Sequence, residues 1–226
     1  MKRVITALLA ALLVLSLAAC GSGVETKKLA GTWTCTIDVT DRMNAAAEQA
    51  LGLSAADGTA QMPLQLVLTV TEDGAYTLRY DSDAVRTALD AYAAALHPAA
   101  VESVYAAAEE QGLSREEYDA AMEKAGITMD DMVAAIFAGV DEEELLSLLT
   151  GRSAALTGYC RAESGQLYLA DTAAELAETA DCLSYTLSDG TMTWTDAQGE
   201  LSSQLTEQEQ ELLRVPLTWT KQEESK

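Results

Sequence analysis

Histidine, phenylalanine and proline are scarce in this chain, which has one histidine, one phenylalanine and three prolines among 226 residues. Most hydrolase designs need a histidine to activate the nucleophile, and His97 is the only one. Because His97 directly precedes Pro98, we expect it to lie at a helix end and to interact with the helix dipole. The sequence also lacks a Gly-rich phosphate loop, a metalloprotease motif and a Gly-x-Ser-x-Gly elbow. We therefore do not expect an enzyme, although a chain with 36 acidic residues is still compatible with a catalytic pair of carboxylates.

Lysine and arginine are few, 14 against 36 aspartates and glutamates, which gives a formal net charge of −22. Removal of residues 1–19 takes Lys2 and Arg3 with it, so the remaining chain carries 12 − 36 = −24. Such a chain repels phosphate backbones and anionic lipid head groups. Nucleic acid is therefore not an expected partner. The simplest explanation of the acidic composition is a soluble surface whose charge makes the molecules repel one another.

Long apolar runs are confined to the N-terminus, where Lys2 and Arg3 precede the almost wholly apolar residues 4–17. This order is typical of a signal peptide, and the run is too short for a membrane span, which needs about 20 residues. The sequence Leu-Ala-Ala-Cys that ends at Cys20 resembles the bacterial lipobox. The resemblance implies that Cys20 carries a diacylglycerol lipid and anchors the protein on the extracytoplasmic side of the cell membrane. Residues 21–23 fit a flexible tether, and an ordinary secretory signal is the alternative.

Cysteine is also rare, and only Cys35, Cys160 and Cys182 follow Cys20. Three thiols allow at most one disulfide. The first two fall on the apolar phase of predicted strands and the third on a polar phase, so buried free thiols are the default interpretation. A zinc site needs ligand pairs at short spacing, and these cysteines are scattered with no histidine nearby. We expect no metal and no cofactor.

Alternation of apolar and polar residues is the main pattern that is present. In residues 30–40 the odd positions from Trp33 to Val39 are apolar, while the even positions carry hydroxyls or charge. That pattern predicts a strand with one buried face. Seven later segments repeat it, and Asp-Gly turns at 73–74 and 189–190 predict two hairpins. The eight candidate strands lie near residues 30–40, 63–70, 76–80, 156–161, 167–169, 183–187, 191–195 and 215–220.

Helical periodicity replaces this alternation between residues 82 and 151. Two Ala-rich helices are predicted at about 83–96 and 99–111, separated by Pro98. Three shorter helices follow, each opened by a hydroxyl or carboxyl residue with an acid three positions later. These pairs are Ser114 with Glu117, Thr128 with Asp131, and Asp141 with Glu144; Thr206 with Glu209 is a fourth candidate, and a short helix over 44–51 with Asn44 as N-cap is also predicted.

The helical block is the most acidic part of the chain, with 15 acids against three basic residues between 82 and 151. Calcium binding is the alternative role of the acids at 130–131 or 141–144, but the loop pattern of calcium sites is absent. Acids in first helical turns complement the macrodipole, so helix capping is the preferred explanation. The methionines of the block are expected in its core, with an adaptable binding groove as the alternative.

The head of the first strand, Gly31-Thr32-Trp33, resembles the Gly-x-Trp motif of lipocalins and lipocalin-like bacterial lipoproteins. The resemblance implies a barrel whose closed end is plugged by the tryptophan, with a late basic residue, Arg214 or Lys221, packed over it. We therefore predict an α+β fold: an antiparallel, roughly eight-stranded lipocalin-like β-barrel with an all-helical insertion between strands three and four. An open two-layer sandwich is the alternative.

The predicted organisation is a signal peptide at 1–19, a lipidated tether at 20–29, a barrel formed by 30–81 and 152–226, and the helical insertion at 82–151. The expected function is binding of a small hydrophobic or amphipathic ligand inside the barrel. The alternative is a cell-envelope protein-interaction module that uses the acidic insertion, with a barrel filled by its own side chains. The candidate ligand-binding residues are Trp33, Tyr76, Tyr80, Tyr185, Trp194 and Trp219.

Overall fold

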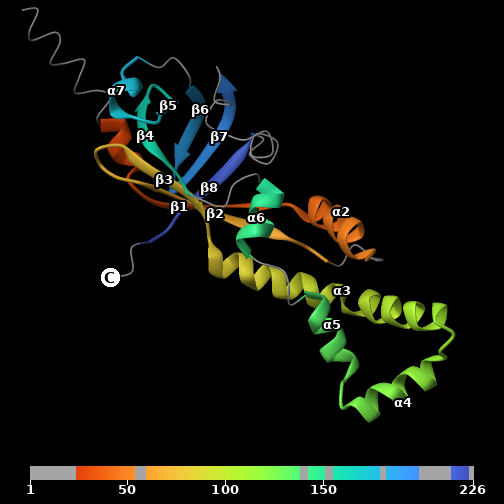
Figure 1. Cartoon of the computed structure of the whole chain (residues 1–226). Helices are drawn as coiled ribbons and strands as arrows, with labels where there is room; N and C mark the ends of the chain where they lie inside the picture. Colours follow the sequence, from red (N-terminus) through yellow and green to blue (C-terminus); the bar gives the residue numbers. More distant parts are fainter. Residues whose placement is uncertain are drawn as a thin grey trace, which may run out of the picture. The chain divides into compact units, whose positions relative to one another are not determined.

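The fold is described from a computed structural model of the whole chain (Figure 1). It describes residues 24–53, 60–137, 142–150, 155–178, 182–198 and 215–223. Four features named above therefore lie outside the described residues: Cys20, Asp141, the Thr206 and Glu209 pair, and Arg214.

Eight antiparallel strands form a closed barrel in which sequence neighbours are spatial neighbours. The barrel closes between the first and last strands, where Trp33 lies opposite Lys221 and Thr34 opposite Thr220. The backbone N–H of Gln222 donates to the carbonyl of Thr32 at 2.8 Å. The predicted barrel is thus confirmed, and the open sandwich is wrong. The strands are β1 Gly31–Asp38, β2 Pro63–Val70, β3 Ala75–Tyr80, β4 Leu156–Glu163, β5 Gln166–Ala170, β6 Cys182–Ser188, β7 Thr191–Gln198 and β8 Leu217–Lys221.

Tight turns set the register of the hairpins. Gly74, between β2 and β3, has φ +88°, and Asp189 and Gly190, between β6 and β7, have φ +46° and +76°. Two successive residues with positive φ make the turn that matches the twist of antiparallel strands. Both predicted Asp-Gly hairpins are therefore confirmed.

A short helix at residues 24–29 precedes β1 and packs against the barrel. Thr26 is 6% exposed, and its Oγ1 accepts a hydrogen bond from the backbone N–H of Ala162 at 3.0 Å. Leu29 is 1% exposed. The segment assigned to the tether therefore has regular structure from Val24 onward.

The helices between β3 and β4 differ from the sequence prediction in one respect. A single helix, α3, runs from Ser82 to Glu110 with Pro98 inside it, so the predicted break at Pro98 is wrong. Leu96 and Ala100, on either side of the proline, are both buried, and this packing holds the helix together across the missing hydrogen bond. The helices are α2 Thr40–Leu51, α3 Ser82–Glu110, α4 Arg115–Ala125, α5 Met129–Phe137, α6 Glu142–Thr150 and α7 Ala173–Leu176.

The predicted capping pairs of α4 and α5 are confirmed. Ser114 Oγ accepts from the Glu117 backbone N–H at 3.3 Å, and the Glu117 carboxylate accepts from the Ser114 N–H at 2.9 Å. Thr128 and Asp131 make the same reciprocal contacts. Asn44, in contrast, is not an N-cap, because α2 already begins at Thr40.

The chain divides into two compact units. The first holds most of the barrel and consists of Met1–Cys35, Leu66–Tyr80 and Ala154–Lys226; the second consists of Thr36–Gln65 and Asp81–Ser153. In the second unit, Leu53, Ala100 and Val133 form a small buried cluster that joins the loop after α2 to α3 and α5.

Candidate functional site

Large side chains dominate the inward face of the barrel. The strand pairs place the predicted apolar phases on the same face, for example Leu68 opposite Leu78 and Leu167 opposite Leu183. All six candidate ligand-binding residues lie in the first unit. Five of them are buried, and Tyr80 is half-buried. The five buried residues and their exposed fractions are Trp33 1%, Tyr76 5%, Tyr185 9%, Trp194 7% and Trp219 0%.

Trp33 is buried near one end of the barrel, where β1 begins and β8 ends. Its Nε1 donates a 2.7 Å hydrogen bond to the carbonyl of Leu29, in the helix that precedes β1. Lys221 covers the ring, with Nζ 5.3 Å from the ring centroid. Of the two basic residues expected over this tryptophan, Lys221 therefore takes the position. We call this end, marked by Trp33 and Lys221, the closed end.

Trp194 and Trp219 form an aromatic pair on β7 and β8, with ring centroids 4.8 Å apart and planes inclined by 47°. Trp219 lies opposite Met192 and Trp194 opposite Leu217, and all four are buried. The two indole N–H groups are buried and have no hydrogen-bond acceptor within the described part of the chain. Buried polar groups without a partner are rare and costly in folded proteins, so we expect each of these N–H groups to bind an acceptor from outside the described residues. We call these two residues the indole pair.

A carboxylate oxygen is also left without a partner near the same face. Glu25 Oε2, in the helix at 24–29, is buried and unpaired among the described residues. Burial raises the pKa of the Tyr185 hydroxyl, and the charge of Glu25 raises it further, as does that of Cys160 once its thiol ionises at alkaline pH. Tyr185 lies directly opposite Trp194. Unmatched acceptors and donors therefore both lie on this part of the barrel.

Gly158 on β4 leaves room for the ring of Tyr76, the residue opposite it on β3. A Cβ at Gly158 would lie 2.9 Å from Tyr76 Cε1 and 2.5 Å from the carbonyl oxygen of Ala170. The next inward positions, Cys160 and Ala162, are also small. The inner wall formed by β4 therefore gives space to the larger residues opposite it.

Cys35, Cys160 and Cys182 are buried and form no disulfide within the described part of the chain, as predicted. Cys182 is buried at the start of β6 although its strand phase is polar, so alternation did not indicate its burial. Burial raises the pKa of the Cys160 thiol to about 12, which leaves it protonated and unreactive at neutral pH. Among the described residues no group of three histidine, cysteine or acidic side chains is placed to hold a metal ion. In the same part of the chain, no helix combines the length and apolar character needed to cross a bilayer.

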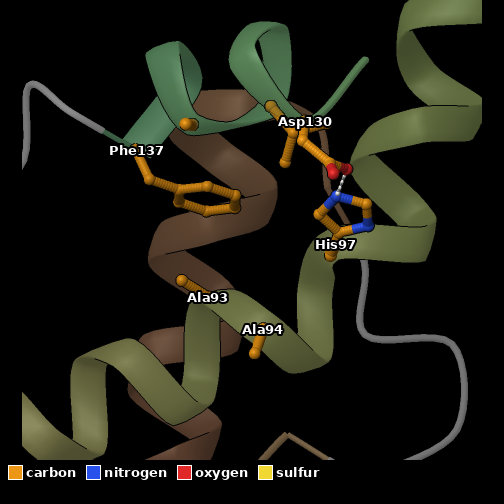
Figure 2. A pocket seen from close by; sticks show the side chains of 7 residues that line it. Ala93, Ala94, His97, Asp130 and Phe137 are labelled. Atoms are coloured by element: carbon orange, nitrogen blue, oxygen red, sulfur yellow. Dashed lines mark hydrogen bonds and ion pairs between the residues drawn. The ribbon is translucent and has the colours of Figure 1, made fainter. Parts of the chain in front are cut away.

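The second unit contains a pocket of about 550 Å³ between α3 and α5 (Figure 2). Figure 2 shows the Phe137 ring on one side and a contact between His97 and Asp130 on the other, with the small residues Ala93 and Ala94 below them in this view. His97 Nε2 lies 3.0 Å from Asp130 Oδ1. The full lining is Ala93, Ala94, His97, Asp130, Val133, Ala134 and Phe137. We call this pocket the α3–α5 groove.

His97 does not lie at a helix end, so the predicted interaction with a helix C-terminus is wrong. The helix continues for 13 residues beyond it to Glu110, and the side chain contacts α5 instead. Periodicity alone could not reveal this contact, because His97 and Asp130 are 33 residues apart in the sequence. Helix capping accounts for the acids at 130–131, so the sequence did not indicate that Asp130 also contacts His97.

No family model, no curated protein and no solved structure matches this chain.

Proposed function

We propose that this protein is a bacterial lipoprotein, anchored by Cys20 on the extracytoplasmic side of the cell membrane, whose barrel binds a small hydrophobic or amphipathic ligand without catalysis. The observation that supports binding is the indole pair. Two buried N–H donors that have no acceptor among the described residues lie on a mostly apolar face, and a few polar groups on an apolar wall are typical of small-molecule sites.

The unpaired donors determine the polar part of the ligand. An indole N–H only donates, so the ligand group at Trp194 and Trp219 accepts hydrogen bonds, as a carbonyl or hydroxyl oxygen does. A neutral group suits this position better than a carboxylate, because the unpaired Glu25 oxygen adds negative charge to the same interior. The body of the ligand is apolar and replaces contacts among the inward side chains.

The test is a panel of medium-chain alcohols, ketones and esters added to residues 24–226, with matched alkanes and carboxylates. A ligand at 100 times its dissociation constant stabilises the fold by about 2.7 kcal/mol. For a domain of this size that raises the melting temperature by roughly 5 to 10 °C. Trp194→Phe and Trp219→Phe keep an aromatic ring and remove the N–H. Each should weaken the binding of acceptor-bearing ligands and leave the binding of alkanes unchanged.

Trp33→Phe is the matched control, because its N–H already bonds to Leu29. It should lower the stability of the free protein without changing the preference for acceptor-bearing ligands. A flat melting temperature across the whole panel would contradict ligand binding in the barrel.

The anchor and the closed end lie near each other along the chain. Only residues 21–23 separate Cys20 from the helix at Val24, a span of at most about 14 Å. That helix is joined to the barrel through Thr26 and Leu29. Lipidation of Cys20 therefore keeps the closed end close to the membrane. Cys20→Ala should release the protein from the membrane fraction, and retention of this variant after a salt wash would contradict the anchor.

A protein-interaction role of the helical insertion is the second candidate. No residue of α4 is buried, and the apolar residues before and after it, Leu113 and Ile127, are 39% and 41% exposed. The acidic surface favours a basic partner. Salt-sensitive binding of a cationic amphipathic peptide, lost in a Leu113→Gln and Ile127→Gln double variant, would support this role. Binding that the double variant retains would contradict it.

A further inference from the structure

The α3–α5 groove has the volume of a small-molecule site but is largely open to solvent, and it is separate from the barrel ligand proposed above. Its volume of about 550 Å³ lies within the usual range for ligand pockets, about 300 to 1,000 Å³. Five of the seven lining residues are apolar, and the two polar ones, His97 and Asp130, contact each other. Both walls come from the second unit, from α3 and α5.

The polar side chains of the groove, His97 and Asp130, have acceptor atoms besides those in their mutual contact. The Asp130 carboxylate only accepts hydrogen bonds, so His97 Nε2 carries the proton of their 3.0 Å contact. In the neutral ring, Nδ1 is then an acceptor. Asp130 also retains its second oxygen, and its side chain is 86% exposed. A surface pair of this kind adds little stability, which leaves the carboxylate available to a ligand.

Pro98 supplies a third acceptor. In an α-helix the carbonyl of residue 94 accepts from the N–H of residue 98, and proline has no N–H. The Ala94 carbonyl in α3 therefore lacks its helical donor, and Ala94 is one of the residues that line the groove. A proline within a continuous helix, one position after His97, thus leaves the carbonyl of a lining residue without its usual helical donor.

The charge of the insertion selects the sign of the ligand. Residues 82–151 carry 15 acids against three basic residues, and such a surface attracts cations and repels anions. A protonated primary amine offers three N–H donors, which matches acceptors from Asp130, His97 and Ala94. The remaining lining, including Val133 and Phe137, is apolar and suits a hydrocarbon body.

We propose that the α3–α5 groove binds a small amphipathic primary amine, with its ammonium group at Asp130, His97 and the Ala94 carbonyl and its apolar body against Val133 and Phe137. Recognition depends on acceptors from both helices, so the ligand bridges α3 and α5. The site is independent of the indole pair, which offers only donors and selects the opposite chemistry.

The test measures binding of octylamine, octanol and octanoate to residues 20–226 carrying Cys20→Ser, by titration calorimetry below micellar concentrations. Octylamine should bind at least about tenfold more tightly than octanol, since hydrogen bonds to charged groups contribute more than neutral ones. Octanoate should not bind. Asp130→Asn should weaken octylamine binding about tenfold. Pro98→Ala should also weaken it, because the restored N–H donates a hydrogen bond to the Ala94 carbonyl.

Glu123→Gln is the matched control, because it removes one exposed acid from the same insertion without touching the groove. Its octylamine affinity should stay within about twofold of the parent. Equal losses in Asp130→Asn and Glu123→Gln would overturn the proposal in favour of general electrostatic attraction. Ala94→Leu fills the groove from an exposed position and should abolish binding, and undiminished binding in that variant would place the amine elsewhere and also overturn the proposal.

Discussion

Lys221 lies over the face of Trp33 and directly opposite it in the sheet, so one residue pair both closes the barrel and covers its end. The same lysine lies close to the glycine of the Gly-x-Trp motif. Gly31 has φ +127°, and a Cβ there would lie 2.7 Å from Lys221 Cε. The glycine is therefore required chiefly by its positive φ, and it also leaves room for the flexible end of the lysine that covers the tryptophan.

Gly31→Ala should destabilise the fold for two reasons. An L-residue is strained at this positive φ, and its Cβ meets the lysine side chain. The expected cost is about 1 to 3 kcal/mol in the free energy of unfolding, measured by urea denaturation.

The double variant Gly31→Ala and Lys221→Ala separates the two causes. Removing the lysine relieves the steric contact but leaves the backbone strain, so the double variant should lose less than the sum of the single variants. Strict additivity would show that the contact with Lys221 contributes nothing.

Alkaline pH should destabilise the protein through buried groups that ionise late. Burial raises the pKa of Cys160 from its ordinary value of 9.0 to about 12, and it raises those of Cys35, Tyr92 and Tyr185 as well. A raised pKa in the folded state means that the contribution to stability is complete below the ordinary value and is lost as pH rises toward the raised one. The free energy of unfolding should therefore fall between about pH 9 and 12, by up to about 1.4 kcal/mol per pH unit for each group.

Cys160→Ala tests the share of this thiol. The variant should show a shallower loss of stability over the same pH range, and an unchanged slope would contradict the assignment. A comparison with Glu163→Cys, an exposed position near the end of the same strand, should show fast alkylation of the new thiol and slow alkylation of Cys160 in the folded protein.

The two capping pairs predict carboxyl pKa shifts of different origin. The pKa of Glu117 is lowered mainly by the backbone N–H of Ser114 and less by its hydroxyl, whereas that of Asp131 is lowered mainly by the Thr128 hydroxyl. Thr128→Ala should therefore raise the pKa of Asp131 more than Ser114→Ala raises that of Glu117. Carboxyl titration by NMR checks both, and each variant serves as the control for the other. Because both pKa values are lowered, the stabilisation is present above the ordinary pKa and is lost as pH falls.

The barrel was predictable because the patterns that specify its strands and hairpins are local in sequence. Alternation identified the strands, the Asp-Gly pairs identified the hairpins, and the strand phase identified the buried aromatic residues. Closure required a long-range partner for Trp33. The resemblance to lipocalins predicted a late basic residue over this tryptophan, and Lys221 takes that position. The indole pair was predicted as two aromatic residues, but its missing acceptors are visible only in three dimensions.

The helical unit was less predictable because tertiary packing outweighed local rules. Pro98 predicts a helix end, yet the burial of Leu96 and Ala100 carries α3 past it. The groove depends on which residues of α5 meet α3, and no spacing within either helix specifies that pairing. A proline with an apolar residue two positions before and after it was the available signal that the helix continues.

Tyr92 and Asn44 provide the last test, which concerns how α2 and α3 are joined. The Tyr92 hydroxyl donates a 2.7 Å hydrogen bond to Asn44 Oδ1, and Tyr92 is 2% exposed. Tyr92→Phe removes the donor and leaves the amide oxygen unpaired, so unfolding should become easier by about 1 to 2 kcal/mol. Asn44→Ala should cost a similar amount, and the double variant should cost less than the sum because both singles remove the same bond. Tyr118→Phe is the control, since the hydroxyl of Tyr118 makes no hydrogen bond among the described residues and its ring contact with Tyr105 survives the change. Urea denaturation of all four variants measures the coupling, and a coupling energy near zero would show that this bond does not join the two helices.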